Sequence, residues 1–101
     1  MFIGVGRYEL FIPASTSLKD KRQILRPITQ SVQNRLRLSV AEVDFQDKWQ
    51  RAAIGVACVA ESIGHCRKML QEAEKVISRA AIDGAEISDR RSTVIALEDV
   101  M

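Results

Sequence analysis

The sequence predicts an α+β sandwich in which two helices cover one face of a four-stranded antiparallel sheet. Two amphipathic stretches with helical periodicity alternate with four apolar or alternating runs, in the order β, α, β, β, α, β. Only residues 47–49 separate the second and third of these runs, which favours a hairpin. Because each β-α-β half crosses over right-handedly, both helices fall on one face. This is the ferredoxin-like arrangement, with strand order 4-1-3-2.

The length of 101 residues fits one domain with one core. No linker, repeat or low-complexity segment divides the chain, so we expect a single domain over residues 1–101. No apolar run approaches the about 20 residues that a membrane-spanning helix needs, and the first residues do not have a basic leader, so we expect a cytoplasmic protein. Cys58 and Cys66 do not have CxxC spacing and are interpreted as buried thiols. We expect neither a metal nor a cofactor.

The first strand and the first helix occupy the first third of the chain. Residues 2–12 are rich in β-branched and aromatic types, and the proline that follows ends the strand. Ser17 is placed to cap the helix, with Asp20 three residues later approximating a capping box. Pro27 lies inside the helix and predicts a bend near residues 23–26. The predicted buried stripe consists of Leu18, Leu25, Ile28, Val32 and Leu36.

The hairpin strands follow. Alternation over residues 39–46 predicts a half-buried edge strand, and the nearly continuous apolar run at residues 50–60 predicts a central strand. Glu42, Asp44 and Gln46 then share the uncovered face. Charge on an edge strand prevents further strand pairing, which is one interpretation of Glu42, Asp44 and Asp47. The alternative, a catalytic pair of carboxylates, has no base at a recognisable spacing, so we expect no enzymatic activity.

The second helix and the last strand complete the fold. The helix begins after Ser62 and ends near Asp83 and Gly84, where glycine is suited to a left-handed cap. The last strand runs over residues 85–98. The polar interruption at residues 89–92 predicts a bulge in it.

The charge is distributed unevenly, although its net value is only +2. Residues 18–37 carry six basic side chains against one acid. A basic band on the first helix and a hairpin tip with a tryptophan favour binding to RNA or to a ribosomal assembly intermediate, through phosphate contacts. The candidate residues are Lys19, Lys21, Arg22, Arg26, Arg37, Lys48, Trp49 and Arg51. The loop before the helix adds a candidate anion site at Ser15, Thr16 and Ser17.

Self-association is the second hypothesis. A sheet face that is not covered by helices and that carries apolar side chains is typical of a homodimer interface. The candidate interface residues are Ile3, Val5, Arg7, Phe11 and Val40.

Two longer motifs carry a family resemblance. SLKDKR at residues 17–22 and SVAEVDFQDKWQRAAIGVA at residues 39–57 resemble, in this order and spacing, the YlxP-like bacterial family, which is classed as a domain of unknown function. The resemblance implies a ferredoxin-like fold and a cytoplasmic bacterial protein whose gene lies near genes for translation initiation and ribosome maturation. Many family members have histidine where this chain has Phe11 and Phe45. The matching positions are Ser17, Leu18, Lys19, Lys21, Arg22, Ala41, Glu42, Val43, Asp44, Gln46, Asp47, Trp49, Gln50, Arg51 and Ala52.

Overall fold

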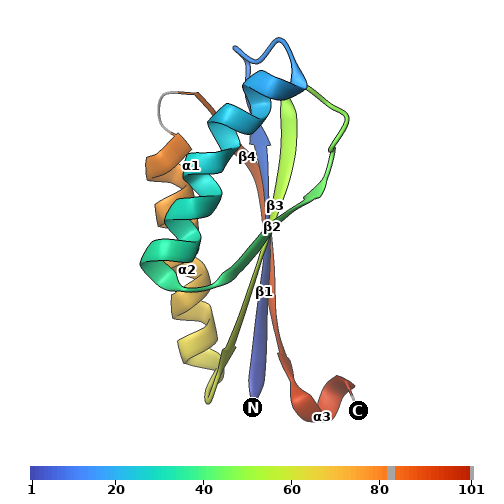
Figure 1. Ribbon diagram of the computed structural model, residues 1–101. Helices are drawn as coiled ribbons and strands as arrows, with labels where there is room; N and C mark the ends of the chain where they lie inside the picture. Colours follow the sequence, from blue (N-terminus) through green and yellow to red (C-terminus); the bar gives the residue numbers. More distant parts are fainter. Residues whose placement is uncertain (82–83, 101) are drawn as a thin grey trace.

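The computed structural model describes residues 1–81 and 84–100, with Asp99 and Val100 described by their backbone only. The sheet order is β2-β3-β1-β4, and all neighbours are antiparallel. Figure 1 shows α1 and α2 on the same side of this sheet. The predicted sandwich and strand order are therefore confirmed. The elements are β1 (Phe2–Phe11), α1 (Leu18–Leu36), β2 (Ser39–Asp44), β3 (Arg51–Ala60), α2 (Ile63–Ala81), β4 (Glu86–Ala96) and α3 (Leu97–Val100).

The core lies between the sheet and the two long helices. In β1 the even-numbered residues from Gly4 to Leu10 are buried against the helices, and the odd-numbered residues face away. The fully buried side chains of the core include Leu10, Ile28, Ile54 and Ile77, from β1, α1, β3 and α2. Within the described part of the chain, no helix is both long and apolar enough to cross a membrane.

A glycine in β1 allows α2 to pack closely on the sheet. A Cβ atom at Gly4 would lie 2.7 Å from Cys58 Sγ and 3.2 Å from both Cys66 Cβ and Leu70 Cδ1. The space that a side chain at position 4 would need is therefore filled by the two cysteines. Both cysteines are buried and free, as expected, and burial raises the pKa of the Cys58 thiol.

The predicted start of α1 is confirmed. The Ser17 hydroxyl accepts a hydrogen bond of 3.0 Å from the backbone N–H of Asp20, as an N-cap should. The helix continues through Pro27 to Leu36 as one element, so the proline is tolerated inside it. Arg37 then takes a left-handed conformation, with φ 55°, and its N–H bonds to the carbonyl of Gln33.

The predicted start of α2 is also confirmed, because the backbone N–H of His65 bonds to the Ser62 hydroxyl. Its last described residue is Ala81, and the predicted end at Asp83 lies outside the described residues. The left-handed cap predicted at Gly84 is wrong, since no described glycine has a positive φ. The N–H groups of Gly84 and Ala85 instead both bond to the carbonyl of Ala81.

The last strand ends earlier than predicted, at Ala96, and the short helix α3 follows it. The bulge predicted at residues 89–92 is wrong, because those residues pair regularly with β1. The register shifts instead between Glu9 and Leu10, which leaves Ser88 as the extra residue.

Candidate nucleic-acid interface

A buried lysine joins the first turns of α1 to the loop between β2 and β3. Lys21 is only 1% exposed, and its ammonium donates to the carbonyl oxygens of Phe45 at 2.7 Å, Arg51 at 3.3 Å and Gln46 at 3.4 Å. It also lies 3.1 Å from Glu42 Oε2. The prediction that Lys21 contacts nucleic acid is therefore wrong, since its charge is used inside the protein.

The position of Lys21 in the sequence indicates that this side chain is buried. Lys21 lies three residues after Leu18 and four before Leu25, on the stripe that faces the sheet. A lysine on an apolar stripe needs an anion or several carbonyls to satisfy it. Glu42, which is the carboxylate of the edge strand nearest to α1, is that anion.

Glu42 faces the helices and not the uncovered face, contrary to the prediction. The register of β2 against β3 shifts between Glu42 and Asp44, so Val43 is the extra residue and the alternation breaks there. Glu42 pairs with Ile54, a core residue, whereas Asp44 pairs with Ala53 on the uncovered face. Glu42 Oε2 is buried and receives no well-directed hydrogen bond, so the nearby Lys21 charge is what compensates its own.

Phe45, the residue after β2, has a left-handed conformation, with φ 61°. Asp44 Oδ1 accepts from the Phe45 N–H at 2.8 Å, and the Phe45 carbonyl accepts from the Lys48 N–H at 3.0 Å as well as from Lys21. The loop therefore begins one residue after Asp44, and the strand predicted to residue 46 is shorter. A bulky residue at positive φ is held there by these bonds.

The uncovered face carries a charge cluster, which we define as Arg7, Glu9, Asp44, Phe45 and Arg51. Arg7 bonds to Glu9 at 2.6 Å and to Asp44 at 3.1 Å, and Arg51 lies 3.6 Å from Glu9. The Arg51 guanidinium carbon lies 3.9 Å from the centre of the Phe45 ring, a cation–π contact. Charges of both signs are balanced here.

The three hydroxyls of the predicted anion site in the loop before α1 already have partners within the protein. Ser15 is buried and its hydroxyl donates to the Ser17 carbonyl, while the Thr16 hydroxyl donates to Asp20 at 2.7 Å. These bonds from Thr16 lower the pKa of Asp20. The charged carboxylate of Asp20 lies at the N-terminus of the helix, where the helix dipole favours it. The Gln50 side-chain amide donates to the carbonyls of Pro13 and Ser15 and fastens this loop to the one after β2.

Three predicted nucleic-acid contacts lie together on α1. Lys19, Arg22 and Arg26 are exposed, and among the residues that the structure describes none of them pairs with a carboxylate. The start of α1 and the loop at residues 45–50 lie at the same end of the molecule (Figure 1). Arg37 lies at the other end of the helix, about 28 Å from its first residue, Leu18, at 1.5 Å per residue. The structure therefore separates Arg37 from the other predicted contacts.

An opening lies beside the loop at this end, and we call it the tip opening. Its volume is about 530 Å³. Two exposed aromatic side chains line it, Trp49 at 55% and Phe11 at 38% exposure. Phe11 was predicted on the uncovered face, and it lies there at the end of β1. The remaining lining residues are Glu9, Leu10, Lys48, Gln50, Arg51 and Ser88.

The other half of the uncovered face carries an apolar patch. Ile3 and Val5 lie on this face, as predicted, but Val40 faces the helices, because it pairs with the buried Val56 and packs against the core. Val59 and Val43 are exposed at 61% and 49%. Val43 was not expected here, since the bulge turns it over Gly55. We define the apolar patch as Ile3, Val5, Val43, Ala57, Val59 and Ile95.

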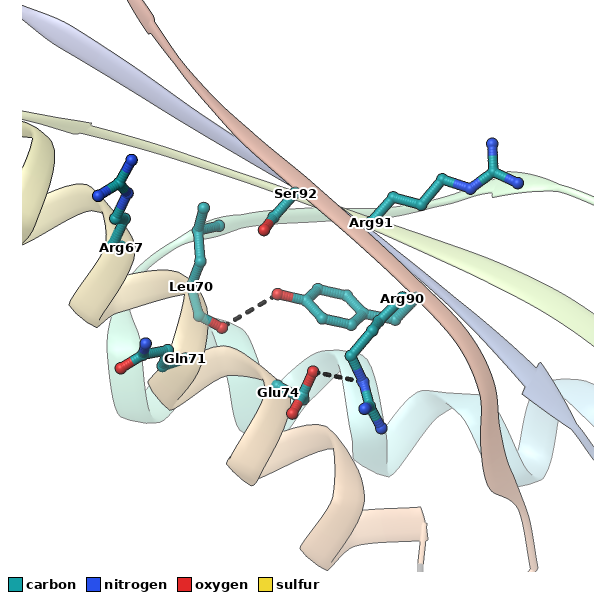
Figure 2. Close-up of a pocket in the computed structure, with 8 residues that line it drawn as sticks. Arg67, Leu70, Gln71, Glu74, Arg90, Arg91 and Ser92 are labelled. Atoms are coloured by element: carbon teal, nitrogen blue, oxygen red, sulfur yellow. Dashed lines mark hydrogen bonds and ion pairs between the residues drawn. The ribbon is translucent and has the colours of Figure 1, made fainter.

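A second opening, of about 240 Å³, lies between α2 and β4. Figure 2 shows the Arg90 side chain turned toward Glu74, at 2.7 Å, and Arg91 pointing away across the strand. Tyr8 lines the opening, and its hydroxyl donates to the Leu70 carbonyl at 3.0 Å. Burial raises the pKa of Tyr8 to about 12. This opening holds no residue predicted as functional.

Comparisons with known proteins address the family and the fold. The family model described as "Protein of unknown function (DUF503)" matches residues 3–92. The chain is 41% identical over 69 residues to "Uncharacterized protein YlxP" of Bacillus subtilis (strain 168). The aligned residues make up 68% of this chain and 75% of that protein.

Two designed proteins share the backbone arrangement. A de novo designed protein with a ferredoxin fold superimposes with a TM-score of 0.56 at 9% identity, over 95% of this chain and 86% of its own. The de novo designed protein Foldit4 gives a TM-score of 0.53 at 10% identity, over 92% and 97% of the two chains. At such identities the likeness concerns the fold alone.

Proposed function

This chain belongs to the DUF503 family of YlxP-like proteins, whose description names no activity, and from its own geometry we propose that it is a non-enzymatic module that binds RNA. The proposed surface is the end of the molecule formed by the first turns of α1 and the loop at residues 45–50. It comprises Lys19, Arg22, Arg26, Lys48 and Trp49, with Arg51 at its edge.

The observation that carries this proposal is the contrast between two sets of cations. On the uncovered face Arg7 and Arg51 are neutralised by Glu9 and Asp44. On α1 the exposed cations have no such partners among the described residues, so their charge is available to phosphates. A surface of this kind binds the backbone of a nucleic acid without reading its sequence.

The network of Lys21 supports the proposal, because it makes one surface from two segments. The lysine bonds from α1 to the carbonyls of Phe45, Gln46 and Arg51, which hold both ends of the loop that carries Trp49. An exposed aromatic beside unneutralised cations suits a single-stranded nucleic acid, since bases stack on the ring while phosphates meet the cations.

The test is salt-dependent binding of a hairpin RNA with a short single-stranded overhang. Replacing Lys19, Arg22 and Arg26 together by alanine should weaken binding and lower the slope of log affinity against log salt by about 2, at about 0.7 per lost contact. The matched control replaces Arg67, Lys68 and Arg79, three exposed cations of α2, and removes the same charge elsewhere. If both triple variants lost the same amount of RNA affinity, the effect would come from the net charge of the protein and not from this surface, which would contradict the proposal.

A second candidate function is self-association through the apolar patch. The occupant that fits this face is a second copy of the chain, because the patch adjoins the charge cluster, where basic and acidic groups are balanced and can meet their opposites across a two-fold axis. The exposed Val43 and Val59 favour this candidate in particular. This interface does not overlap α1, so both functions are compatible in one assembly.

A further inference from the structure

We propose that the tip opening receives one unpaired nucleobase of the RNA, stacked against Trp49 and Phe11. This inference rests on the proposed RNA binding and adds to it the kind of RNA that is preferred: one with an unpaired base next to a paired stem. The carrying observation is that the two exposed aromatic side chains at this end of the sheet line the same opening.

The register explains why Phe11 is uncovered. Phe11 is opposite Arg51 in β3, and both side chains lie on the face away from the helices. The Arg51 guanidinium lies over the Phe45 ring and 3.6 Å from Glu9. The Phe11 ring is therefore exposed at the end of the sheet, with the loop that carries Trp49 beside it.

The position of Trp49 is fixed by contacts on both sides of it. The backbone carbonyl of Gln50 accepts from the Ile12 N–H at 2.8 Å, and the Gln50 side chain donates to Pro13 and Ser15. On the other side the Lys48 N–H bonds to the Phe45 carbonyl, which Lys21 also holds. The indole is thus presented on a loop that is ordered before any ligand arrives, which lowers the entropic cost of stacking.

Polar and charged residues make up most of the lining, and its one acid, Glu9, is paired with Arg7 and Arg51, so the lining favours a nucleotide over an apolar side chain of a protein. Lys48 lines the opening itself, and Lys19 and Arg22 begin the basic face of α1 at the same end of the molecule. A base in the opening places its own phosphate near Lys48. Ser88 and Gln50 at the rim supply polar groups to the edge of the base without selecting one base.

The experiment compares two hairpin RNAs that differ only in whether the overhang nucleotides carry their bases. Binding is measured by fluorescence anisotropy of the labelled RNA, and the emission of Trp49, the only tryptophan, reports stacking directly. We expect the hairpin with bases to bind about tenfold more tightly than the abasic one and to quench the emission. Phe11→Ala should reduce this ratio toward one while leaving the affinity for the abasic hairpin unchanged, and Trp49→Ala should reduce the ratio as well.

The control variant is Val59→Ala, which removes an exposed apolar side chain at the other part of the same sheet face and should keep the full ratio. Equal binding of the two hairpins by the wild-type protein would overturn this inference alone. Failure to bind either hairpin would overturn the proposed RNA function together with it. A loss of abasic-hairpin binding in Phe11→Ala would show that the ring acts through the fold, which also overturns the inference.

Discussion

The ammonium of Lys21 lies 2.7 Å from the carbonyl oxygen of Phe45. Within the described part of the chain, only Phe45 and Arg37 combine a side chain with a positive φ. A left-handed conformation costs a residue with a Cβ about 1–2 kcal/mol, so it persists where the surroundings hold it. A side chain from α1 therefore determines how the loop after β2 leaves the sheet.

Replacing Lys21 by methionine should destabilise the protein strongly. The variant leaves Glu42 near the core without its counter-charge and leaves the carbonyls of the loop without a donor. Breaking a buried pair in this way costs about 3 kcal/mol or more, measured as the free energy of unfolding in urea. The matched control is Lys19→Met, at an exposed position of the same helix, where a change within about 0.5 kcal/mol is expected. Equal costs in the two variants would refute the role of Lys21.

Replacing Gly4 by alanine should also destabilise the protein, by about 1–3 kcal/mol, because the new methyl group meets Cys58 Sγ at 2.7 Å in a filled core. Gly64 provides the control, since a Cβ there has no neighbour within 4 Å. Gly64→Ala in α2 should stabilise by about 0.5–1 kcal/mol through helix propensity. Thermal unfolding of both variants gives the comparison, and a stabilised Gly4→Ala would contradict the close packing of α2.

Tyr8 should titrate late, because burial raises its pKa from the usual 10.0 to about 12. The neutral form is favoured in the folded state, so the stability from this group is fully present below pH 10.0 and is lost as the pH rises toward about 12. Tyr8 is the only tyrosine, so the absorbance of its phenolate reports the titration directly. A midpoint near 10 in the folded protein would be inconsistent with the buried hydroxyl. Tyr8→Phe should flatten the dependence of stability on pH in this range.

Val59→Asp should convert a dimer to monomers if the apolar patch is the interface, because a charge would be buried without a partner. Sedimentation velocity measures the change. Since Val59 is 61% exposed in one chain, the substitution should not unfold it. Ile63→Asp makes the same change at another exposed apolar residue, at the start of α2, and should leave the association intact. A dimer that survives Val59→Asp would exclude this face.

The elements that were predicted correctly are those whose signal is local and repeated. The helical spacing of Leu25, Ile28 and Val32 agrees with the buried face of α1, and Ser17 caps that helix as its position indicates. Such patterns survive because packing on one sheet face requires them. The order of strands then follows from the handedness of the crossovers.

The site was predicted less well, because single residues decide it. The extra residue at Val43 puts Glu42 and Asp44 on opposite faces of the sheet, and nothing in a regular alternation marks that shift. Gly55 is the physical partner of this bulge, since a Cβ there would lie 2.7 Å from Val43 Cγ1. The burial of Lys21 was visible only by combining its place on the apolar stripe with a carboxylate on another element. Long-range pairs of this kind are what a single sequence conceals.

The two outer strands of the sheet differ in how well they can be extended. β2 has six residues, whereas β4 has eleven and offers a longer unpaired edge, although the pairing of each strand has one register shift. If a second chain extended the sheet, it would therefore pair with β4. Two chains joined in this way would expose only β2 at either end of the joined sheet. Such an assembly would present a six-residue strand with a bulge at each of its ends.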